Sequence, residues 1–267
     1  MSDIVVEVRD SVGSVRLNRP DRGNSVTPDV ITRLGEAVRD LAEQDAVRAV
    51  VLTGTGKVFC AGADVKEMYA VYQDTGADGL MQYQEDVWMP SVQRTVRTLW
   101  SVRKPLVAAF NGAATAGGLD FGLSCDVRVA ANTARFAESY VNLGMVPVAG
   151  GAFLLPVLIG LGPATELLAT GRFIDAERAY ALGMVNEVCE PEQVTERAHD
   201  LAAGLAGGSS ETFAHTKQIA RNAVAEQFDL ALRESYQANI ELMKRDEVRE
   251  RIVAVMERYS LKHAKSS

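Results

Sequence analysis

The chain has 267 residues, of which 47% are hydrophobic and 24% charged, as is ordinary for a globular protein. Its 28 basic and 35 acidic residues give a net charge of −7, and no cluster of Lys and Arg forms a stripe that would follow phosphates, which argues against a nucleic-acid partner. No apolar run approaches the roughly 18–20 residues that cross a bilayer, and the N-terminal Met-Ser-Asp-Ile lacks the features of a signal peptide, so we expect a cytoplasmic protein without a membrane partner.

The first part of the chain predicts two strands, a helix and a third strand. Short apolar runs predict strands over residues 4–8 and 12–17, joined by a tight turn. Thr27 and Pro28 suit the cap and the first position of a helix. The apolar stripe of that helix is Val30, Ile31, Leu34, Val38 and Leu41. A strand over residues 47–53 follows at a spacing that fits a β-α-β crossover.

The middle of the chain predicts a loop over residues 54–62 and a helix that begins near Asp64. Residues 69–100 are rich in aromatic side chains, and we interpret them as two helices with a mobile join at residues 76–79. The apolar run over residues 105–110 predicts a buried strand.

The remainder predicts strands over residues 126–130, 136–144 and 185–188, separated by helices that end at Gly171 and Gly183. From residue 192 onward the pattern is helical, with breaks at residues 207–208 and near residue 228. The predicted fold class is therefore α/β, with a core over residues 1–190 and a helical C-terminal region over residues 191–267. That region is expected to pack on its own core or on a neighbouring subunit, and to cover part of the active site.

The most informative stretch is residues 111–126, Asn-Gly-Ala-Ala-Thr-Ala-Gly-Gly-Leu-Asp-Phe-Gly-Leu-Ser-Cys-Asp. A buried strand leads into a turn of small residues, and the turn opens into a helix near Gly117, whose first N–H groups lack intrahelical partners. Asp120 lies within one helical turn of those donors. Free N–H groups beside a carboxylate can polarise a carbonyl and move a proton next to it.

A second turn of the same kind spans Phe59-Cys-Ala-Gly-Ala-Asp64. One N–H from each turn, at Ala63 and Gly117, would converge on a single carbonyl oxygen as an oxyanion hole. Neither turn fits the dinucleotide fingerprint or the P-loop. The three cysteines and three histidines lack metal-ligand spacing, so we expect no metal site.

These stretches resemble the crotonase superfamily, which includes enoyl-CoA hydratases and isomerases, over about residues 4–260. The matching segments lie at residues 15–20, 50–54, 59–68, 104–118 and 179–186, in the order found in the family. The resemblance implies a spiral core of ββα repeats and a homotrimer or a hexamer (a dimer of trimers). It also implies an acyl-CoA substrate whose thioester oxygen is held by the N–H groups of Ala63 and Gly117, with no cofactor apart from the coenzyme A of the substrate.

The family binds coenzyme A around the first motif, so the expected contacts are Ala61, Asp64, Val65 and Lys66. The acyl pocket is expected to be lined by Tyr72, Trp88 and Met89, for which packing in the core is the alternative.

Hydratases of the family use two glutamates, and both positions differ here. The first falls on Asp120, which is one methylene shorter, and we interpret it as catalytic rather than as a helix cap. The second falls on Tyr140, which is a poor base at neutral pH and is either catalytic or a packed side chain. Glu138 shares a face with Tyr140 in an extended segment. We expect Glu138 to be a solvated surface carboxylate, with a catalytic position as the alternative.

The leading interpretation is an enzyme of the enoyl-CoA hydratase/isomerase type that acts on an acyl-CoA through an enolate-like intermediate, by hydration, double-bond shift or C–C cleavage. One alternative is a hydrolase that opens a β-keto or cyclic acyl-CoA, which needs the same hole and only one carboxylate. A catalytically silent acyl-CoA-binding protein is the alternative from another class, because fold alone does not fix chemistry.

Overall fold

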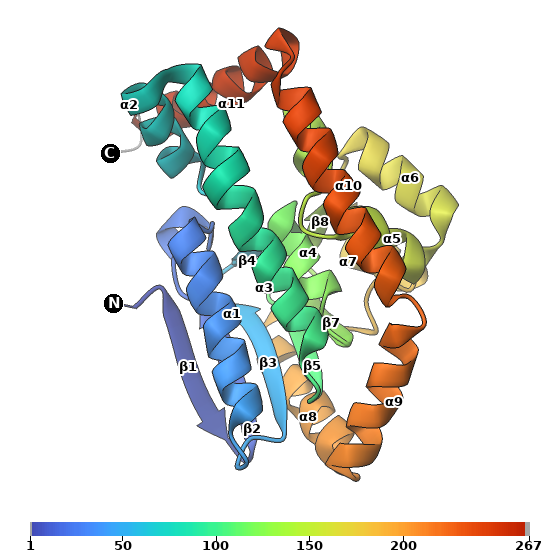
Figure 1. The fold of residues 1–267 in the computed structure, drawn as a ribbon. Coiled ribbons are helices and arrows are strands. Elements are labelled where there is room, and N and C mark those ends of the chain that lie inside the picture. Colours follow the sequence, from blue (N-terminus) through green and yellow to red (C-terminus); the bar gives the residue numbers. More distant parts are fainter. Residues whose placement is uncertain (1, 265–267) are drawn as a thin grey trace.

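The computed structural model describes residues 2–264 as two sheets surrounded by helices (Figure 1). Residues 265–267 of the expected C-terminal region lie outside the described residues. The larger sheet has the order β1-β2-β3-β5-β7-β10. Its strands are β1 (Ile4–Arg9), β2 (Val12–Leu17), β3 (Ala49–Gly54), β5 (Leu106–Phe110), β7 (Val127–Ala131) and β10 (Glu187–Cys189).

Only β1 runs antiparallel to its neighbour in the larger sheet, and the other pairs are parallel. Strands β3 and β5 are buried along their whole length, which explains their almost continuously apolar sequences. The sequence alone therefore predicts strands β3 and β5 to lie in the core.

A smaller sheet has the order β4-β6-β8-β9 and runs beside the first. Its strands are β4 (Val58–Cys60), β6 (Ala113–Thr115), β8 (Arg135–Ala137) and β9 (Ile174–Asp175). The pairs β3-β4, β5-β6 and β7-β8 each give one strand to each sheet, and a helical segment follows each pair. This arrangement confirms the ββα repeats that the resemblance implied.

Helix α1 (Pro28–Glu43) packs on α3 (Met89–Ser101) and on the first strands of the larger sheet. The side chain of Thr27 caps α1 by accepting a hydrogen bond from the N–H of Val30, as the sequence predicts. The five predicted stripe residues of α1 are all buried. Helix α8 (Val194–Ala206) packs along β3, β5 and β7, so the helical region also covers the sheet.

Helix α2 (Val65–Tyr83) is interrupted at Gly76, where φ is 72° and ψ is −172°. The chain continues through a π-helical turn, η2 (Gln84–Trp88), directly into α3. The predicted join therefore falls at Gly76, within one nearly continuous helical segment. Helix α11 (Asp246–Ala264) packs against α2 at one end of the molecule (Figure 1).

The other helices follow the repeats and fill the C-terminal part. They are α4 (Gly117–Leu123), α5 (Gly151–Ile159), α6 (Leu161–Thr170), α7 (Ala176–Ala181), α9 (Ser210–Asn222) and α10 (Ala225–Met243). The 3₁₀ turns are η1 (Pro20–Arg22), η3 (Ser139–Leu143) and η4 (Pro191–Gln193). Gly171 ends α6 in the left-handed conformation, as predicted.

Three predictions of local structure are wrong, all in the smaller sheet. Residues 54–62 are not only a loop, because they contain β4, and the turn before α4 contains β6. Residues 136–144 do not form one extended segment, because β8 ends at Ala137 and η3 begins at Ser139. Strands of three residues are too short for a period of two to be recognised. Between residues 2 and 264 no helix combines the length and the apolar character needed to cross a bilayer.

Helix α4 approaches strand β4 without a side chain between them. A Cβ on Gly118 would overlap the carbonyl oxygen of Cys60 and lie 2.7 Å from the Cys60 Cβ. Because backbone cannot rotate away, we expect Gly118→Ala to lower the free energy of unfolding by about 1–3 kcal/mol, measured by urea denaturation. The control is Gly204→Ala in α8, where a Cβ meets open space and should be neutral or stabilise by up to ~1 kcal/mol. Equal stability of Gly118→Ala and the native protein would contradict the close approach.

Candidate active site

Two turns meet where α4 approaches β4. A Cβ on Gly62 would lie 3.1 Å from the carbonyl oxygen of Thr115 and 3.8 Å from the nitrogen of Gly117, so the turns are in contact. Ala116 has φ 48° and ψ −128°, a conformation that costs a non-glycine residue about 1–3 kcal/mol. Its N–H donates to the carbonyl of Ala137 at 2.9 Å, which holds the turn in place.

The N–H groups of Ala63 and Gly117 donate to no protein acceptor among the hydrogen bonds found for residues 2–264. Both residues line the same pocket. The bridge between Val26 and Ala63 uses the carbonyl of Gly62 and the N–H of Asp64, which leaves the N–H of Ala63 unpaired within the described chain. The two residues that the sequence singled out therefore border one cavity, and neither N–H has an acceptor within the described chain.

Asp120 lies in α4 and is fully buried. Its Oδ2 accepts a hydrogen bond from the Tyr140 hydroxyl at 3.0 Å, while its Oδ1 receives no hydrogen bond from the described N–H and O–H groups. Burial raises the pKa of Asp120 to about 7, although the neighbouring side chains of Glu138 and Tyr140 act in the opposite direction. A carboxyl group with a pKa near neutrality can both accept and return a proton.

The expectation that Glu138 is a solvated surface carboxylate is wrong. Its side chain is 1% exposed, and neither carboxyl oxygen receives a hydrogen bond from the described donors. Burial raises the pKa of Glu138 well above its usual value, and the nearby charge of Asp120 adds to this rise. The turn from β8 into η3 directs Glu138 inward, toward the backbone of Gly151 at the start of α5.

Tyr140 stands between this carboxyl pair and the cavity. It is 4% exposed and lines the pocket, whereas Asp120 and Glu138 are not among the lining residues. Its hydroxyl lies 3.3 Å from the position of a Cβ on Gly117, beside the turn that carries the free N–H. Burial and the charges of Asp120 and Glu138 raise the pKa of Tyr140 well above 10, so the hydroxyl stays protonated.

The pocket has a volume of about 500 Å³ and is mostly apolar. The pocket extends from the two turns to helix α11. This helix belongs to the C-terminal region that we expected to cover part of the active site. Its walls come from the first turn of α2, from η2, from η3 and from α11. The lining side chains beyond those of the turns are Val65, Met68, Gln84, Trp88, Ser139, Tyr140, Asn142, Leu143, Met145, Ile252, Val255, Met256 and Arg258.

Of the three expected acyl-pocket residues, only Trp88 lines the cavity. Met89 is fully buried in the core, and Tyr72 stacks on Tyr69 with ring centroids 6.1 Å apart. Met89 therefore follows the alternative of packing in the core, and Tyr72 does not line this cavity. Gln84 and Trp88, four residues apart in the π-helical turn, both line the pocket, whereas the neighbouring Met89 is buried in the core.

The residues expected to contact coenzyme A border a smaller hollow that continues from the pocket. The four predicted residues, Ala61, Asp64, Val65 and Lys66, all line this hollow. Arg22 and Ser25, which the sequence did not single out, line it as well. All four predicted residues are thus brought together, and their role in binding stays a prediction.

Asp64 also has a structural role at this hollow. Its side chain is 2% exposed, pairs with Arg19 at 2.8 Å and accepts hydrogen bonds from the N–H groups of Lys66 and Glu67. The Asp64 carboxylate therefore fixes the turn that carries Ala63 and the start of α2.

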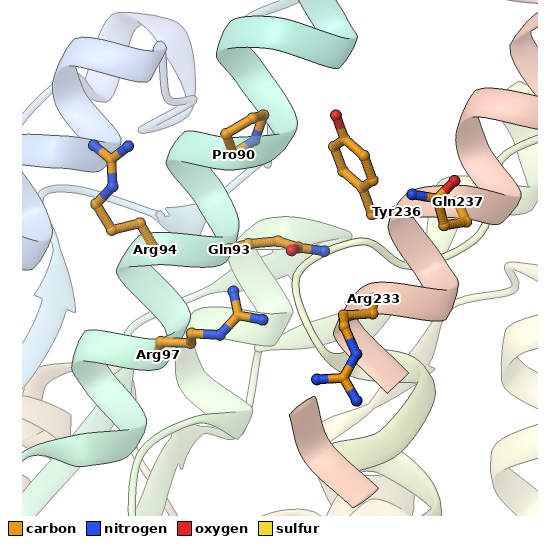
Figure 2. A pocket seen from close by; sticks show the side chains of 7 residues that line it. All are labelled: Pro90, Gln93, Arg94, Arg97, Arg233, Tyr236 and Gln237. Carbon is orange, nitrogen blue, oxygen red and sulfur yellow. The ribbon is translucent and has the colours of Figure 1, made fainter. Parts of the chain in front are cut away.

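A different hollow lies between α3 and α10, with a volume of about 530 Å³ (Figure 2). Arg97 projects from α3 toward Arg233 of α10, whereas Arg94 points away from it, and Arg97 pairs with Asp229 at 3.1 Å. Its lining includes no carboxyl, thiol or imidazole group. This hollow is therefore not a candidate for the proton chemistry of the first pocket.

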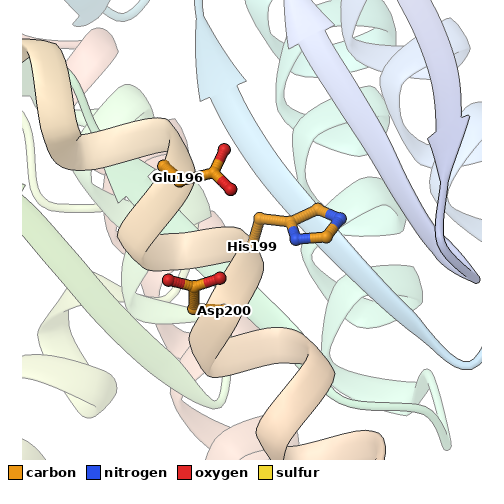
Figure 3. A group of neighbouring side chains, drawn as sticks. All are labelled: Glu196, His199 and Asp200. Carbon is orange, nitrogen blue, oxygen red and sulfur yellow. The ribbon is translucent and has the colours of Figure 1, made fainter.

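Glu196, His199 and Asp200 gather on one side of α8, with one potential ligand atom from each within 4.8 Å of the others (Figure 3). Arg9 occupies the same region, because it pairs with Glu196 at 2.8 Å and its backbone oxygen lies 3.2 Å from Nε2 of His199. A guanidinium beside the group opposes a cation there.

A family model described as enoyl-CoA hydratase/isomerase matches residues 7–265. A putative enoyl-CoA hydratase/isomerase of Bacillus subtilis is 37% identical over 192 residues, which cover 72% of this chain and 70% of that protein. A short-chain-enoyl-CoA hydratase of Clostridium acetobutylicum is 29% identical over 268 residues, covering 100% of this chain and 99% of the relative. The crystal structure of an enoyl-CoA hydratase from Bacillus halodurans matches with a TM-score of 0.84 at 25% identity, covering 95% of this chain and 100% of that one.

Burial of Asp120 makes stability depend on pH. A raised pKa means that the folded state binds the proton more tightly than the unfolded chain, so the stabilisation is complete below the ordinary value of 3.8 and is lost as the pH rises through about 7. Asp120→Asn removes this loss. We expect its advantage in unfolding free energy over the native protein to be on the order of 1–3 kcal/mol larger at pH 8 than at pH 5.

Urea denaturation at the two pH values measures this difference. Asp74→Asn, at an exposed position of α2, is the matched control and should give the same difference from the native protein at both. An advantage of Asp120→Asn that does not grow with pH would show that Asp120 is not held in a raised-pKa state.

Proposed function

Because the chain belongs to the enoyl-CoA hydratase/isomerase family of acyl-CoA enzymes, we propose that it forms a thioester enolate and carries one proton between substrate and Asp120 through the hydroxyl of Tyr140. The observation that carries the proposal is the 3.0 Å hydrogen bond from Tyr140 to Asp120, made by a tyrosine that lines the pocket.

The thioester oxygen would be held by the N–H groups of Ala63 and Gly117. Support comes from their lack of protein acceptors among the described residues and from their place on one cavity. In the enolate, negative charge develops on the thioester oxygen, and an aligned backbone donor stabilises such charge by about 3 kcal/mol.

Tyr140 would carry the proton in both directions. When the α-carbon of the acyl group is deprotonated, its proton passes to the phenolic oxygen while the phenolic proton passes to Asp120. Asp120 thereby becomes neutral, the enolate carries the negative charge, and Tyr140 is unchanged. Reversing the transfer at a different carbon shifts a double bond.

This arrangement favours a proton shift over ordinary two-carboxylate hydration. In hydration of a double bond, one group activates water while another delivers a proton to carbon. Here the Tyr140 hydroxyl lies beside the turn at Gly117 and lines the pocket, whereas Asp120 and Glu138 are enclosed and do not line it. Hydrolysis of a C–C bond in a β-keto or cyclic acyl-CoA needs only one carboxylate and remains the alternative that substrate tests distinguish.

Exchange of α-protons tests the proposal without knowledge of the native acyl group. Butyryl-CoA in D₂O should acquire deuterium at its α-carbon in the presence of the protein, as measured by mass spectrometry. Tyr140→Phe and Asp120→Asn should each lower the exchange rate at least ~10²-fold, because each interrupts the transfer.

The control is Tyr180→Phe, since the Tyr180 side chain is exposed and takes no part in the proposed transfer. It should exchange at the native rate. If neither Tyr140→Phe nor Asp120→Asn slowed the exchange, the proton path would be wrong. Binding of butyryl-CoA with no exchange by the native protein would favour a silent acyl-CoA-binding protein.

Hydration of crotonyl-CoA is expected to be slow in the native protein, since no carboxyl group lines the pocket near the two turns. Tyr140→Glu places a second acid there and should raise the hydration rate about 10-fold or more, measured by the loss of enoyl absorbance. A native kcat near ~10³ s⁻¹, which is high for enzymes, would contradict this expectation.

A further inference from the structure

Glu138 is a fully enclosed acid that the proton path through Tyr140 does not use. Its two carboxyl oxygens receive no hydrogen bond from the donors of the described residues, and the same holds for Oδ1 of Asp120. Both acids point at one spot beside α5. A Cβ on Gly151 would overlap Oδ1 of Asp120 and would lie 2.7 Å from Oε1 of Glu138.

Two carboxyl oxygens that face the same small space cannot both belong to ionised groups, because neither has a donor and their charges repel. A single proton between them removes the repulsion and supplies the missing donor. Buried polar groups are paired in native structures, and a shared proton is the pairing that these side chains permit.

We propose that Glu138 is a positioning residue that keeps this proton and donates it to Oδ1 of Asp120, so that Oδ2 of Asp120 is held as a carboxylate oxygen ready to receive the proton of Tyr140. The inference rests on the proposed function, since it assigns Glu138 the task of preparing Asp120.

The two oxygens of Asp120 then have separate partners. Tyr140 donates to Oδ2 at 3.0 Å, and Glu138 donates to Oδ1. Without the second donor, a fully buried Asp120 would keep only one hydrogen bond, and burial would favour its neutral form. A neutral Asp120 cannot accept the proton of Tyr140.

Among the described residues, no cationic side chain influences Asp120 or Glu138 and could perform this task instead. The titratable groups that influence Asp120 are Glu138 of the segment after β8 and Tyr140 of η3, and Asp120 is the group that influences Glu138. Helix α5 meets the pair with the backbone of Gly151, which carries no side chain. The described neighbours of Asp120 thus stabilise its charge through two O–H donors alone.

Infrared spectroscopy tests the shared proton without any substrate, since a protonated carboxyl has its own C=O stretch. At pH 9, above the pKa of about 7 for Asp120, the native protein should still show one protonated carboxyl band. Glu138→Gln should lose that band. Identical bands in the two proteins would overturn the proposal.

The pH dependence of butyryl-CoA α-proton exchange tests the effect on Asp120. Activity of the native protein should rise with pH through about 7, as Asp120 becomes a carboxylate. Glu138→Leu removes the donor and should move this rise to higher pH by about one unit or more. Glu138→Gln keeps an N–H donor and should leave the rise near its native position. Equal shifts in both variants, or no shift in Glu138→Leu, would overturn the proposal.

Gly151 provides a second route to the same result, should Glu138→Leu fail to fold. Gly151→Ala pushes the two acids apart and should also move the rise to higher pH. Gly162→Ala, in the first turn of α6 where a Cβ meets nothing within 4 Å, should not move it. Exchange that persists in Asp120→Asn would refute the proposed function itself, while the infrared band would still report on Glu138.

Discussion

The contact between helix α4 and strand β4 is the constraint on which the rest of the site depends. Gly118 faces the backbone of Cys60, and Gly62 faces the turn at Gly117, so no side chain separates the two repeats. Because of this approach, Ala63 and Gly117 border the same cavity. A larger residue at either glycine would push the two turns apart and so separate Ala63 from Gly117.

The contact between α4 and β4 also fixes the position of the buried acid Asp120 on α4. Asp120 lies one turn along α4 from Gly117 and is enclosed, while Tyr140 reaches past it to the pocket. A direct carboxylate at the cavity would be more exposed to water, and its pKa would be closer to that of an ordinary acid. In the function that we propose, a tyrosine in front of an enclosed aspartate keeps that base out of water and connects it to the substrate through one hydroxyl.

Much of the fold follows from the sequence because its strongest patterns are local. The stripe and cap of α1, the apolar strands β3 and β5, and the small-residue turn before α4 each act within a few residues, and all are observed. The turns also carry the family resemblance, which explains why Ala63, Gly117 and Asp120 were found.

What the sequence did not predict depends on contacts between distant segments. Strands β4 and β6 have three residues each and exist because they pair across the small sheet. Glu138 was expected in solvent, because nothing near it in the chain shows that Gly151 leaves room for it. Met89 lies in the core and its neighbour Trp88 lines the pocket, a difference that depends on how distant segments pack around this helix.

The site is costly to fold, and an aromatic cluster beneath it offsets that cost. Burying two acids and holding Ala116 at a positive φ both destabilise the native state.

Phe110 of β5 packs edge-to-face against Phe59 of β4, at 4.7 Å between ring centroids, and against Phe136 of β8, at 4.9 Å. Such pairs stabilise by about 0.5–1.5 kcal/mol beyond the burial of their area. Gly122 of α4 rests directly on the Phe110 ring, so the cluster joins the two sheets and supports the helix that carries Asp120. The rigidity that the proposed shared proton requires would thus come from apolar packing that takes no part in the proposed chemistry.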